Sequence, residues 1–310
     1  MRLLVVCGAT ASGKTALAVE CAKRLNGEVI SADALLVYKK LNIGTAKPTI
    51  EEMGGIPHHM IDVVEPEESF SVSDYERLAL PILEDILARG KMPVICGGTG
   101  FYMNALLYKS GFGETPADNA VRRKFEKIAA EDGREALHKI LERVDPESAE
   151  KLHFNDVKRV VRALEIYELT GKRKSEQNDE MIPRYPFSAV AFDYPREELY
   201  ARIERRVDIM LKAGLIEEVK GLLDSGVPEN AQCMQGIGYK EVVETLKNRD
   251  IQSTMSDIIE EISQKIKQNT RNYAKRQLTF FKRTQNLILL TPKNLSDSAE
   301  EVCNIYHECR

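Results

Sequence analysis

The sequence predicts an α/β protein built on a parallel sheet, with a helical insertion and a helical C-terminal region. Three observations support this prediction. Short apolar runs alternate with segments of helical periodicity through the first hundred residues, and two of the runs end in glycine-rich loops. The segment from Gly113 to Pro186 has no β-branched runs and is rich in Glu, Lys, Arg and Ala. Repetition of strand, loop and helix is typical of a parallel sheet with helices on both faces.

Apolar runs give the expected strands of this sheet. They are Leu3–Cys7, Glu28–Ser31, Pro93–Cys96 and Ser188–Phe192. The segment after the first run repeats apolar residues with helical spacing. A later helix is expected to begin at a capping box of Ser73 and Glu76 and to be kinked by Pro81. The remainder of the chain after the last run is expected to be helical.

The middle of the chain is expected to be a helical domain inserted between sheet elements. Its expected helices are Ala120–Ala130, Arg134–Val144 and Asp156–Leu169. Gly171 suits the end of the last helix, because glycine readily adopts the left-handed conformation found there. We therefore expect residues 113–186 to form the insertion domain, and residues 1–112 and 187–310 to form the core domain.

Composition restricts the class of protein only coarsely. The 310 residues carry 44 Lys and Arg against 48 Asp and Glu, a formal net charge of −4, which argues weakly against a nucleic-acid partner. No apolar stretch approaches the roughly eighteen residues of a membrane span. The six cysteines form no C-x-x-C pair, so we expect a reduced, cytoplasmic protein. Cys303, His307 and Cys309 are too few ligands to predict a zinc site.

The strongest motif is a G-x-x-x-x-G-K-T loop between an expected strand and an expected helix. In such a loop backbone N–H groups converge on phosphate oxygens, and the helix N-terminus adds a positive field. Lys14 supplies a cation to the terminal phosphates, and the Thr15 hydroxyl can ligate Mg²⁺. The motif predicts a P-loop NTPase-like core that binds a di- or triphosphate. The loop consists of Gly8, Ala9, Thr10, Ala11, Ser12, Gly13, Lys14 and Thr15.

Two further loops follow expected strands, at the sheet edge where open α/β folds bind their ligands. Asp33 suits metal binding, general-base catalysis or helix capping, and its position alone does not separate catalysis from capping. The Gly97–Gly100 loop either brings the Thr99 hydroxyl to a phosphate or is only a tight turn that needs positive φ. The adjacent His58 and His59 are expected to be satisfied core or loop residues rather than ligands.

Basic residues gather in the last long helix despite the net negative charge. Its apolar residues recur every seventh position and are expected to form one stripe on which the helix packs. This stripe consists of Ile259, Ile266, Tyr273 and Phe280. Seven Lys and Arg residues lie between Gln264 and Thr284 without an acidic residue among them. Lys267, Arg271 and Lys275 share a face, which suits a phosphate backbone or is simply a solvated cationic face.

Two pairs of arginines elsewhere are helical neighbours. They are Arg159 with Arg162 and Arg202 with Arg206. Each pair suits either bidentate binding of phosphate oxygens or a surface ion pair, and the sequence does not separate the two.

Several blocks in order resemble the bacterial tRNA dimethylallyltransferases, also called tRNA isopentenyltransferases, of the IPP transferase family. The resemblance runs from the glycine loop to about Arg283. Its most specific blocks are Ile30–Asp33, Asn42–Pro48, Gly55–His59, Gly97–Tyr102, Asn155–Asp156, Gly236–Lys240 and Tyr273–Gln277. The resemblance implies transfer of a dimethylallyl group from dimethylallyl diphosphate to N6 of the tRNA adenosine 3′ of the anticodon (position 37), with pyrophosphate as the second product.

The resemblance also implies roles for individual residues. Asp33 would be the general base that takes the N6 proton, and Thr99 would contact the reacting groups. Arg206 would stabilise the departing pyrophosphate, although the sequence does not decide between Arg202 and Arg206 as its main contact. Mg²⁺ would bind near Thr15.

Binding of tRNA is implied for three segments and several single residues. They are Asp33, Ala34, Leu35, Leu36, Thr99, Arg122, Lys158, Arg159, Val160, Val161, Arg162, Gln235, Gly236, Ile237, Gly238, Tyr239 and Lys240, to which the cationic face adds Lys267, Arg271 and Lys275. The insertion domain would clamp the anticodon stem-loop. We expect a monomer that has no membrane partner.

Three other classes of protein share parts of this pattern. A P-loop kinase of small molecules would turn over nucleoside triphosphates and would not need the basic helix. An adenylate prenyltransferase would act on free nucleotide and would have less use for a tRNA-binding insertion. A non-catalytic RNA-binding module would not need Asp33 or Thr99.

Overall fold

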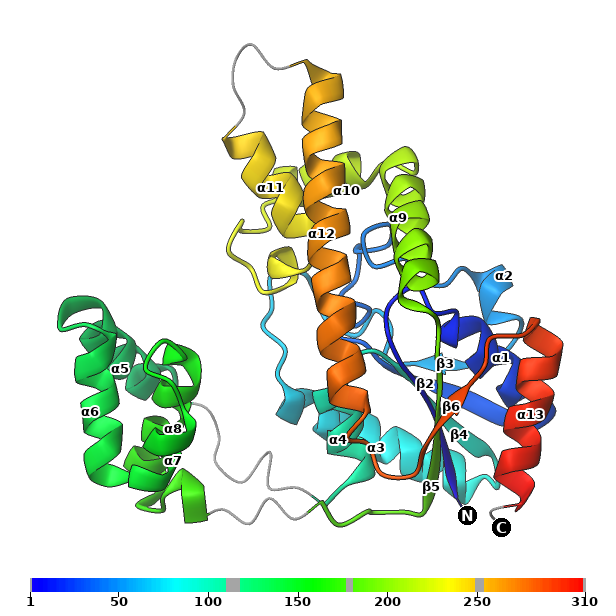
Figure 1. Cartoon of the computed structure of the whole chain (residues 1–310), viewed down its shortest axis with the longest axis horizontal. Coiled ribbons are helices and arrows are strands. Elements are labelled where there is room, and N and C mark those ends of the chain that lie inside the picture. Colours follow the sequence, from blue (N-terminus) through cyan, green and yellow to red (C-terminus); the bar gives the residue numbers. More distant parts are fainter. Residues whose placement is uncertain (1, 110–117, 177–180, 249–253, 309–310) are drawn as a thin grey trace. The chain divides into compact units, whose positions relative to one another are not determined.

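The chain forms two compact units in the computed structural model, which describes residues 2–109, 118–176, 181–248 and 254–308. The first unit comprises Met1–Tyr108 and Pro183–Arg310, and the second comprises Lys109–Ile182. The second unit thus begins and ends four residues before the insertion expected over residues 113–186. Helices surround a sheet in the first unit, whereas the described part of the second unit is helical (Figure 1).

A parallel sheet, six-stranded over the described residues, forms the centre of the first unit. The strand order is β3-β2-β4-β1-β5-β6, and each neighbouring pair is parallel. The strands are β1 (Leu3–Cys7), β2 (Gly27–Ala32), β3 (His58–His59), β4 (Met92–Gly97), β5 (Phe187–Phe192) and β6 (Leu287–Leu290). The α/β fold on a parallel sheet is therefore confirmed, and the four expected strands are β1, β2, β4 and β5.

The two edge strands were not expected from the sequence. β3 has only two residues, both histidines, and β6 has four aliphatic residues without polar alternation. The expectation that everything after Ser188–Phe192 is helical is therefore wrong, because β6 pairs with β5 from Ala189 to Phe192. Edge strands this short leave little periodic signal in a sequence.

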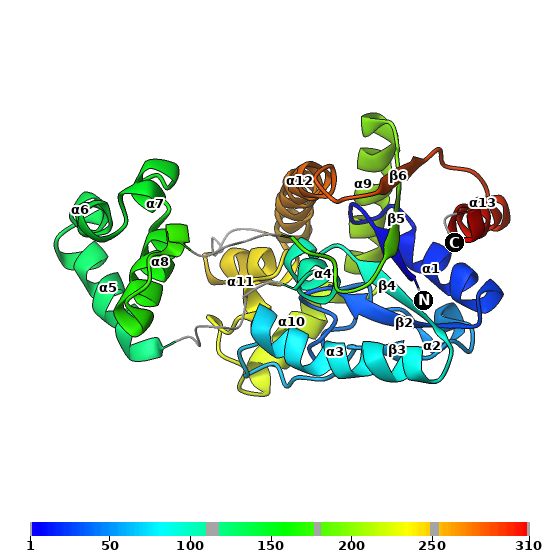
Figure 2. The ribbon, with the colours of Figure 1, turned by 90° about the horizontal axis from the view of Figure 1, so that it is seen from below.

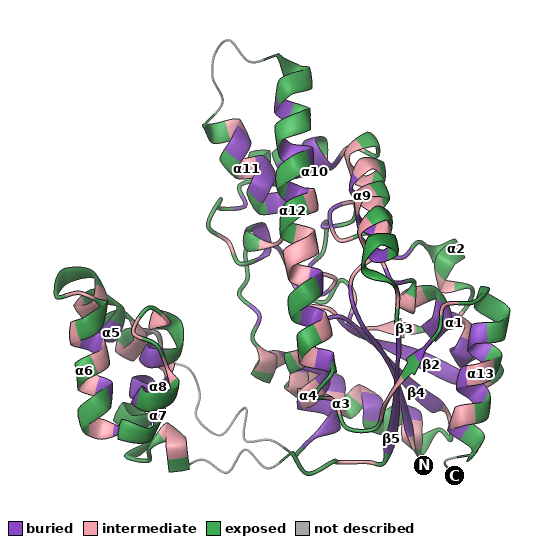
Figure 3. Ribbon diagram, viewed as in Figure 1, coloured by how far each residue is buried: buried purple, intermediate pink, exposed green. Residues whose placement is uncertain are grey.

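Helices pack on both faces of the sheet (Figure 2). Those of the first unit are α1 (Lys14–Arg24), α2 (Ile50–Met53), α3 (Val72–Ala88), α4 (Gly100–Leu107), α9 (Arg196–Lys212), α10 (Leu215–Asp224), α11 (Tyr239–Lys247), α12 (Met255–Phe281) and α13 (Leu295–Glu308). Alternate residues of β1 enter different cores: Val5 packs in the core with residues of α3 and α4, and Val6 in the core with residues of α1 and α13. The strands β1, β2, β4 and β5 are buried along their whole length (Figure 3), and burial on both faces explains why most of their residues are apolar.

The capping box of α3 lies two residues before the expected one. Ser71 is the N-cap: its Oγ accepts from the backbone N–H of Asp74, and the Asp74 carboxylate accepts from the N–H of Ser71. Ser73 and Glu76 offer the same spacing but lie inside the helix, so that expectation is wrong. Pro81 lies within α3 without ending it.

The apolar stripe of α12 also differs from the expected one. Ile259 is 40% exposed, whereas Ile258, Ile262 and Ile266 are buried at a spacing of four residues. Residues seven apart fall about 20° behind per step on a helix of 3.6 residues per turn. A stripe drawn through seventh positions therefore drifts by about 60° over three steps, which carries Ile259 off the buried face.

The second unit packs four α-helices in its described part around a small apolar core. They are α5 (Asn119–Glu131), α6 (Arg134–Val144), α7 (Pro146–Lys151) and α8 (Val157–Thr170). The three helices expected here coincide with α5, α6 and α8 to within one residue, and Gly171 ends α8 in the left-handed conformation. A fully buried carboxylate, Glu165, accepts hydrogen bonds from the backbone N–H of Asp118 and from Arg162, and forms an ion pair with Arg122.

Glu28 gives the first unit a testable dependence of stability on pH. Its buried carboxylate accepts hydrogen bonds from Arg89, Lys91 and His59, and the hydrogen bonds from Arg89 hold the pKa of Glu28 well below its usual 4.5, against the opposing effect of burial. Because this pKa is depressed on folding, the stabilisation is complete above about pH 4.5 and is lost as the pH falls toward the folded-state pKa.

We therefore expect Glu28→Gln to lower the free energy of unfolding at pH 7 by about 2 kcal/mol. The difference from wild type should shrink as the pH falls below about 4.5. Urea unfolding at several pH values measures both, with Asp85→Asn as the control, since Asp85 is an exposed carboxylate bonded to Arg89. A difference that stays constant down to pH 3 would contradict this role of Glu28.

Candidate functional site

The glycine loop joins β1 to α1 in the conformation that phosphate binding needs. Gly8 and Gly13 have φ of 134° and 86°, and Ala11 has φ of 62°, which turns the backbone tightly ahead of Lys14, the first residue of α1. This geometry presents backbone N–H groups and the N-terminus of an eleven-residue helix to a ligand.

Two side chains from distant elements fix this loop. The N–H of Thr10 donates to Gln277 Oε1 at 2.9 Å, and Gln277 Nε2 donates to the carbonyl of Gly98 at 2.9 Å. Arg202 Nε donates to the carbonyl of Ala11 at 2.8 Å. Gln277 therefore ties the loop after β1 to the loop after β4.

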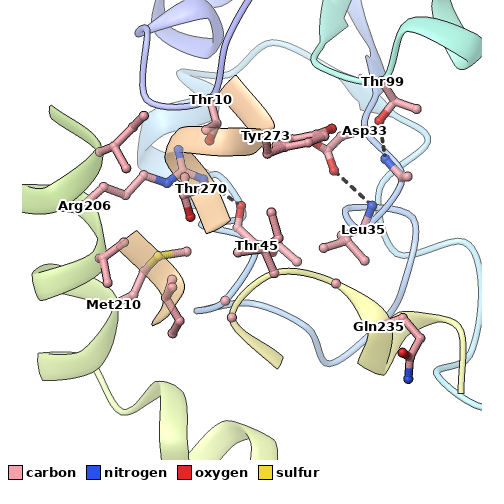
Figure 4. Close-up of a pocket in the computed structure, with 18 of the residues that line it drawn as sticks. Thr10, Asp33, Leu35, Thr45, Thr99, Arg206, Met210, Gln235, Thr270 and Tyr273 are labelled. Atoms are coloured by element: carbon pink, nitrogen blue, oxygen red, sulfur yellow. Dashed lines mark hydrogen bonds between the residues drawn. The ribbon is translucent and has the colours of Figure 1, made fainter. Parts of the chain in front are cut away.

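Arg202 and Arg206, one turn apart on α9, have different surroundings. Arg202 holds the loop backbone at Ala11 and lies over the ring of Tyr194. Arg206 lines the cavity beside the loop and donates from Nη2 to the carbonyl of Thr45 at 3.0 Å (Figure 4). The geometry favours Arg206 as the guanidinium that faces a ligand.

Asp33 follows β2 and Thr99 follows β4, and both side chains bind the backbone of the turn after β2 (Figure 4). Asp33 Oδ1 accepts from the N–H of Leu35 at 2.9 Å and of Leu36 at 3.4 Å. Thr99 Oγ1 accepts from the N–H of Ala34 at 3.0 Å. Asp33 therefore does cap the turn, and both bonds use Oδ1, so Oδ2 has no hydrogen-bond partner among the described residues.

These groups line a cavity of about 400 Å³ in the first unit. Asp33, Thr99 and Arg206 are among its polar lining residues. Several of its apolar lining residues come from α9, α12 and the loop before α11. They are Ile203, Val207, Met210, Ile237 and Ile266. A cavity of this kind suits a ligand with one charged and one hydrocarbon part.

A smaller and more polar pocket of about 40 Å³ adjoins the glycine loop and is lined by Lys14, Thr15, Asp33, His58 and Arg206, among others. Desolvation lowers the pKa of Lys14 and of Arg206, while the Asp33 carboxylate opposes this for both. Burial thus disfavours the charged forms of Lys14 and Arg206, and an anionic ligand bound in this pocket would stabilise both charges.

The few protein oxygens around Thr15 suit a magnesium ion whose other ligands are phosphate oxygens of the bound substrate. No group of three or more His, Cys, Asp or Glu residues that could hold a metal exists among the described residues. Mg²⁺ commonly binds through one or two protein oxygens together with phosphate oxygens, and the Thr15 hydroxyl in a pocket shared with Asp33 provides that arrangement.

His58 and His59 form β3, and each has a partner. His59 Nε2 lies 2.8 Å from the Glu28 carboxylate, and His58 Nδ1 lies 2.8 Å from the carbonyl of Ile56. His58 Nε2 is buried, has no partner among the described residues and belongs to the lining of the small pocket.

The basic face of α12 is divided by its surroundings. Lys267 and Arg271 form ion pairs of 2.6 Å with Asp208 and Glu204 of α9, whereas Lys275 is exposed and forms no ion pair within the described parts of the chain. The first two cations thus help α12 to pack on α9, and RNA could use them only by competing with these carboxylates. Lys275 is thus the member of this face that no carboxylate of the described residues neutralises.

Several residues of the expected tRNA-binding segments are buried. Tyr239 is fully buried with its hydroxyl on Glu218, and Val160 and Val161 lie in the core of the second unit. Their side chains hold the segments in place rather than contact a ligand. Other residues of the segments 158–162 and 235–240 are accessible. The side chains of Lys158, Arg159, Gln235 and Lys240 are exposed. Gly236 and Ile237 line the cavity.

Three residues at or near the site were not predicted from the properties of individual residues in the sequence. Tyr273 lines the cavity, where burial raises its pKa to about 12. Gln277 bridges two loops, and Glu218 binds the loop after β2. The block Tyr273–Gln277 was a signal for the first two, but neither spacing nor composition distinguishes Glu218.

Together the fold and the site define an α/β protein with a phosphate-binding loop beside a cavity that has both charged and apolar lining residues. A family model described as IPP transferase matches residues 36–284, and one described as isopentenyl transferase matches residues 1–65. The chain belongs to the IPP transferase family, which confirms the resemblance seen in the sequence blocks.

The match to two bacterial relatives extends over nearly their whole length. The chain is 45% identical over 303 residues to a tRNA dimethylallyltransferase of Acetivibrio thermocellus, covering 97% of this chain and 94% of that one. A tRNA isopentenylpyrophosphate transferase from Bacillus halodurans is 39% identical with a TM-score of 0.68, and the match covers 99% of each chain. A eukaryotic dimethylallyltransferase acting on tRNA is 30% identical with a TM-score of 0.83, covering 100% of this chain and 80% of that one.

Proposed function

We propose that this chain transfers the dimethylallyl group of dimethylallyl diphosphate to N6 of the adenosine at position 37 of tRNA. The observation that carries the proposal is that Asp33 and Arg206 line both the cavity with apolar lining and the small pocket formed by Lys14 and Thr15 of the glycine loop. The apolar lining suits the five-carbon group, and the cations suit the diphosphate. The names of the relatives, which describe enzymes acting on tRNA, support the choice of acceptor.

The glycine loop and two cations bind and activate the donor. Backbone N–H groups and Lys14 hold the diphosphate, and Arg206 neutralises the charge that grows on it as the carbon–oxygen bond breaks. Mg²⁺ near Thr15 would supply further positive charge to the same oxygens when bound. Pyrophosphate then leaves with the bonding electron pair.

Asp33 removes the proton from the attacking amine. An exocyclic amine of adenine is a weak nucleophile, so loss of its proton during attack assists formation of the nitrogen–carbon bond. Asp33 Oδ2 accepts that proton, while Oδ1 keeps its bonds to the turn. Thr99, whose hydroxyl accepts from Ala34, fixes the turn against the Gly97–Gly100 loop.

The acceptor base must leave its stack to reach this cavity. An adenine in a stacked anticodon loop cannot bring N6 to Asp33, so we propose that it is flipped out. Unpaired loops are the parts of RNA that proteins read by sequence, which suits the exposed Gln235 and the adjoining Gly236 and Ile237. We propose that the second unit clamps the stem through the exposed Lys158 and Arg159, while Arg122 stays paired with Glu165. We also propose that the enzyme acts as a monomer in the cytoplasm, where tRNA is found.

One assay separates this function from its competitors. The protein and Mg²⁺ are incubated with labelled dimethylallyl diphosphate and either an anticodon stem-loop or free AMP. Label only in the stem-loop supports the proposal, and label only in AMP would make the chain an adenylate prenyltransferase. Turnover of nucleoside triphosphate without label in either acceptor would make it a kinase. Binding of the stem-loop without label or turnover would leave an RNA-binding module.

Lys275 is expected to contribute to RNA affinity through a phosphate. We expect Lys275→Gln to weaken stem-loop binding and to reduce the slope of log K against log salt by about 0.7 to 0.9, the value of one phosphate contact. Titrations at several salt concentrations measure this, with Lys23→Gln on α1 as the charge-matched control. Replacing Lys267, Arg271 and Lys275 together should reduce the slope little further, because the first two are ion-paired. An unchanged slope in Lys275→Gln would exclude the contact.

In the part of the chain that the structure describes, no helix combines the length and the apolar character that crossing a membrane requires.

A further inference from the structure

Glu218 on α10 is the centre of a hydrogen-bond cluster outside the machinery described above. Its Oε2 accepts from the backbone N–H groups of Asn42 at 2.9 Å and Ile43 at 2.8 Å. Its Oε1 accepts from the N–H of Gly44 at 3.0 Å and from the Tyr239 hydroxyl at 2.6 Å. One carboxylate thus satisfies three consecutive backbone donors of the loop that follows β2.

The position of this loop is fixed from two sides. A Cβ at Gly44 would lie 2.5 Å from the ring of Tyr239, so the loop backbone packs directly on that buried ring. At its end Thr45 is fastened by its own hydroxyl, which donates to the carbonyl of Leu41 at 2.7 Å. Glu218 is the charged member of this cluster, and charge-assisted hydrogen bonds are the strong ones. The position of the loop therefore depends mainly on that carboxylate.

The loop carries this restraint to Arg206. The carbonyl of Thr45, the residue after the clamped Gly44, accepts from Arg206 Nη2 at 3.0 Å (Figure 4). Thr45 and Arg206 both line the cavity and the small pocket, and Glu218 lines neither. Glu218 can therefore influence a ligand there only through the loop and the guanidinium that the loop holds.

We propose that Glu218 is a positioning residue that orients the Arg206 guanidinium toward the diphosphate, an inference that rests on the role proposed for Arg206. A guanidinium donates in fixed directions, so a bond from one nitrogen to a fixed carbonyl determines where the remaining N–H groups point. Glu218 keeps that carbonyl in place before the donor arrives. Departure of pyrophosphate then needs no reorganisation of Arg206, which is the condition under which electrostatic stabilisation is most effective.

Glu218→Gln tests the proposal with a matched control on the same helix. Each carboxylate oxygen accepts two donors, so the NH₂ group of glutamine would face two donors wherever it lies. We expect Glu218→Gln to weaken binding of inorganic pyrophosphate with Mg²⁺ about tenfold and to lower kcat about tenfold, with the KM for RNA within about twofold. Glu217→Gln removes the same charge from the neighbouring exposed residue and should leave all three unchanged. Calorimetry and steady-state kinetics give these values.

A double-mutant cycle with Arg206→Ala distinguishes positioning from general damage. If Glu218 acts through Arg206, adding Glu218→Gln to Arg206→Ala should lower the affinity for pyrophosphate by less than about twofold relative to Arg206→Ala alone. Losses that multiply, or equal affinities in Glu218→Gln and Glu217→Gln, would overturn the proposal. Should Glu218→Gln fail to give a cooperative thermal transition, Glu218→Asp, which keeps the charge on a shorter side chain, replaces it in the cycle. A wild type that binds pyrophosphate but labels no RNA would refute the proposed function, while the pyrophosphate cycle would still decide the role of Glu218.

Discussion

Asp33→Asn is expected to lower kcat by about 10²–10⁴-fold while leaving the affinity for an anticodon stem-loop within about threefold. Asparagine keeps the oxygen that accepts from the N–H groups of Leu35 and Leu36, so the turn after β2 should persist. It lacks the second carboxylate oxygen, which is the proton acceptor in the proposed reaction. The variant therefore separates general-base catalysis from turn capping, the two roles that the sequence leaves open for Asp33.

Single-turnover labelling of the stem-loop measures the rate, and a binding titration measures the affinity. Asp224→Asn, at an exposed carboxylate of α10 that lines neither pocket, is the charge-matched control. Full activity in Asp33→Asn with loss in Asp33→Ala would make Asp33 a structural cap. Full activity in both would remove it from the mechanism.

The sequence predicts the parts of the site whose chemistry is contained in one short segment. The glycine loop needs its glycines for positive φ and its lysine for charge. The sequence of residues 8–15 alone therefore predicts both the backbone conformation of the loop and its phosphate-binding role. Asp33 and Thr99 were found because each follows a buried strand, and parallel strands bring such positions to one edge. The six-stranded order itself was not expected, because β3 and β6 are too short to show a period.

Contacts between segments far apart in the chain could not be predicted from the sequence, and the reason is physical. Gln277 meets Thr10 across 267 positions, and Glu218 meets Asn42 across 176. A glutamine or glutamate at a buried or half-buried helical position has no local pattern that marks its partner. Lys267 and Arg271 illustrate the same limit, since their spacing showed one cationic face, whereas the acidic residues that neutralise them lie on α9.

These ion pairs help to explain how a chain with a net charge of −4 can bind RNA through only a few of its cations. Several cations of α12, α5 and α8 are paired within their own unit, as Lys267 is with Asp208 and Arg122 with Glu165. The charge free to attract RNA is therefore confined to fewer residues than the basic runs suggest, among them the exposed Lys275 and Lys158. An enzyme that must release its product RNA is better served by few contacts than by a uniformly basic surface, because each phosphate contact adds affinity without adding specificity.

Lys14→Met is expected to lower kcat/KM for dimethylallyl diphosphate by about 10²–10³-fold and to weaken binding of pyrophosphate, with stem-loop affinity little changed. Desolvation lowers the pKa of Lys14, so the ammonium group gains most when a phosphate replaces the lost water. Methionine keeps the unbranched stem and removes only the charge. Lys14→Arg should not restore activity, because the larger planar guanidinium does not fit the place of a compact ammonium within the small pocket.

Lys23→Met on the last turn of α1 is the matched control, since it removes the same charge from an exposed position of the same helix. Its kcat/KM and pyrophosphate affinity should equal those of wild type. Raising the pH should also weaken pyrophosphate binding in wild type earlier than an ordinary lysine would require, because a lowered pKa means that the ammonium group loses its proton at a lower pH. That alkaline limb should be absent in Lys14→Met. Pyrophosphate affinities that are equal in Lys14→Met and Lys23→Met would show that the glycine loop holds the diphosphate by its backbone alone.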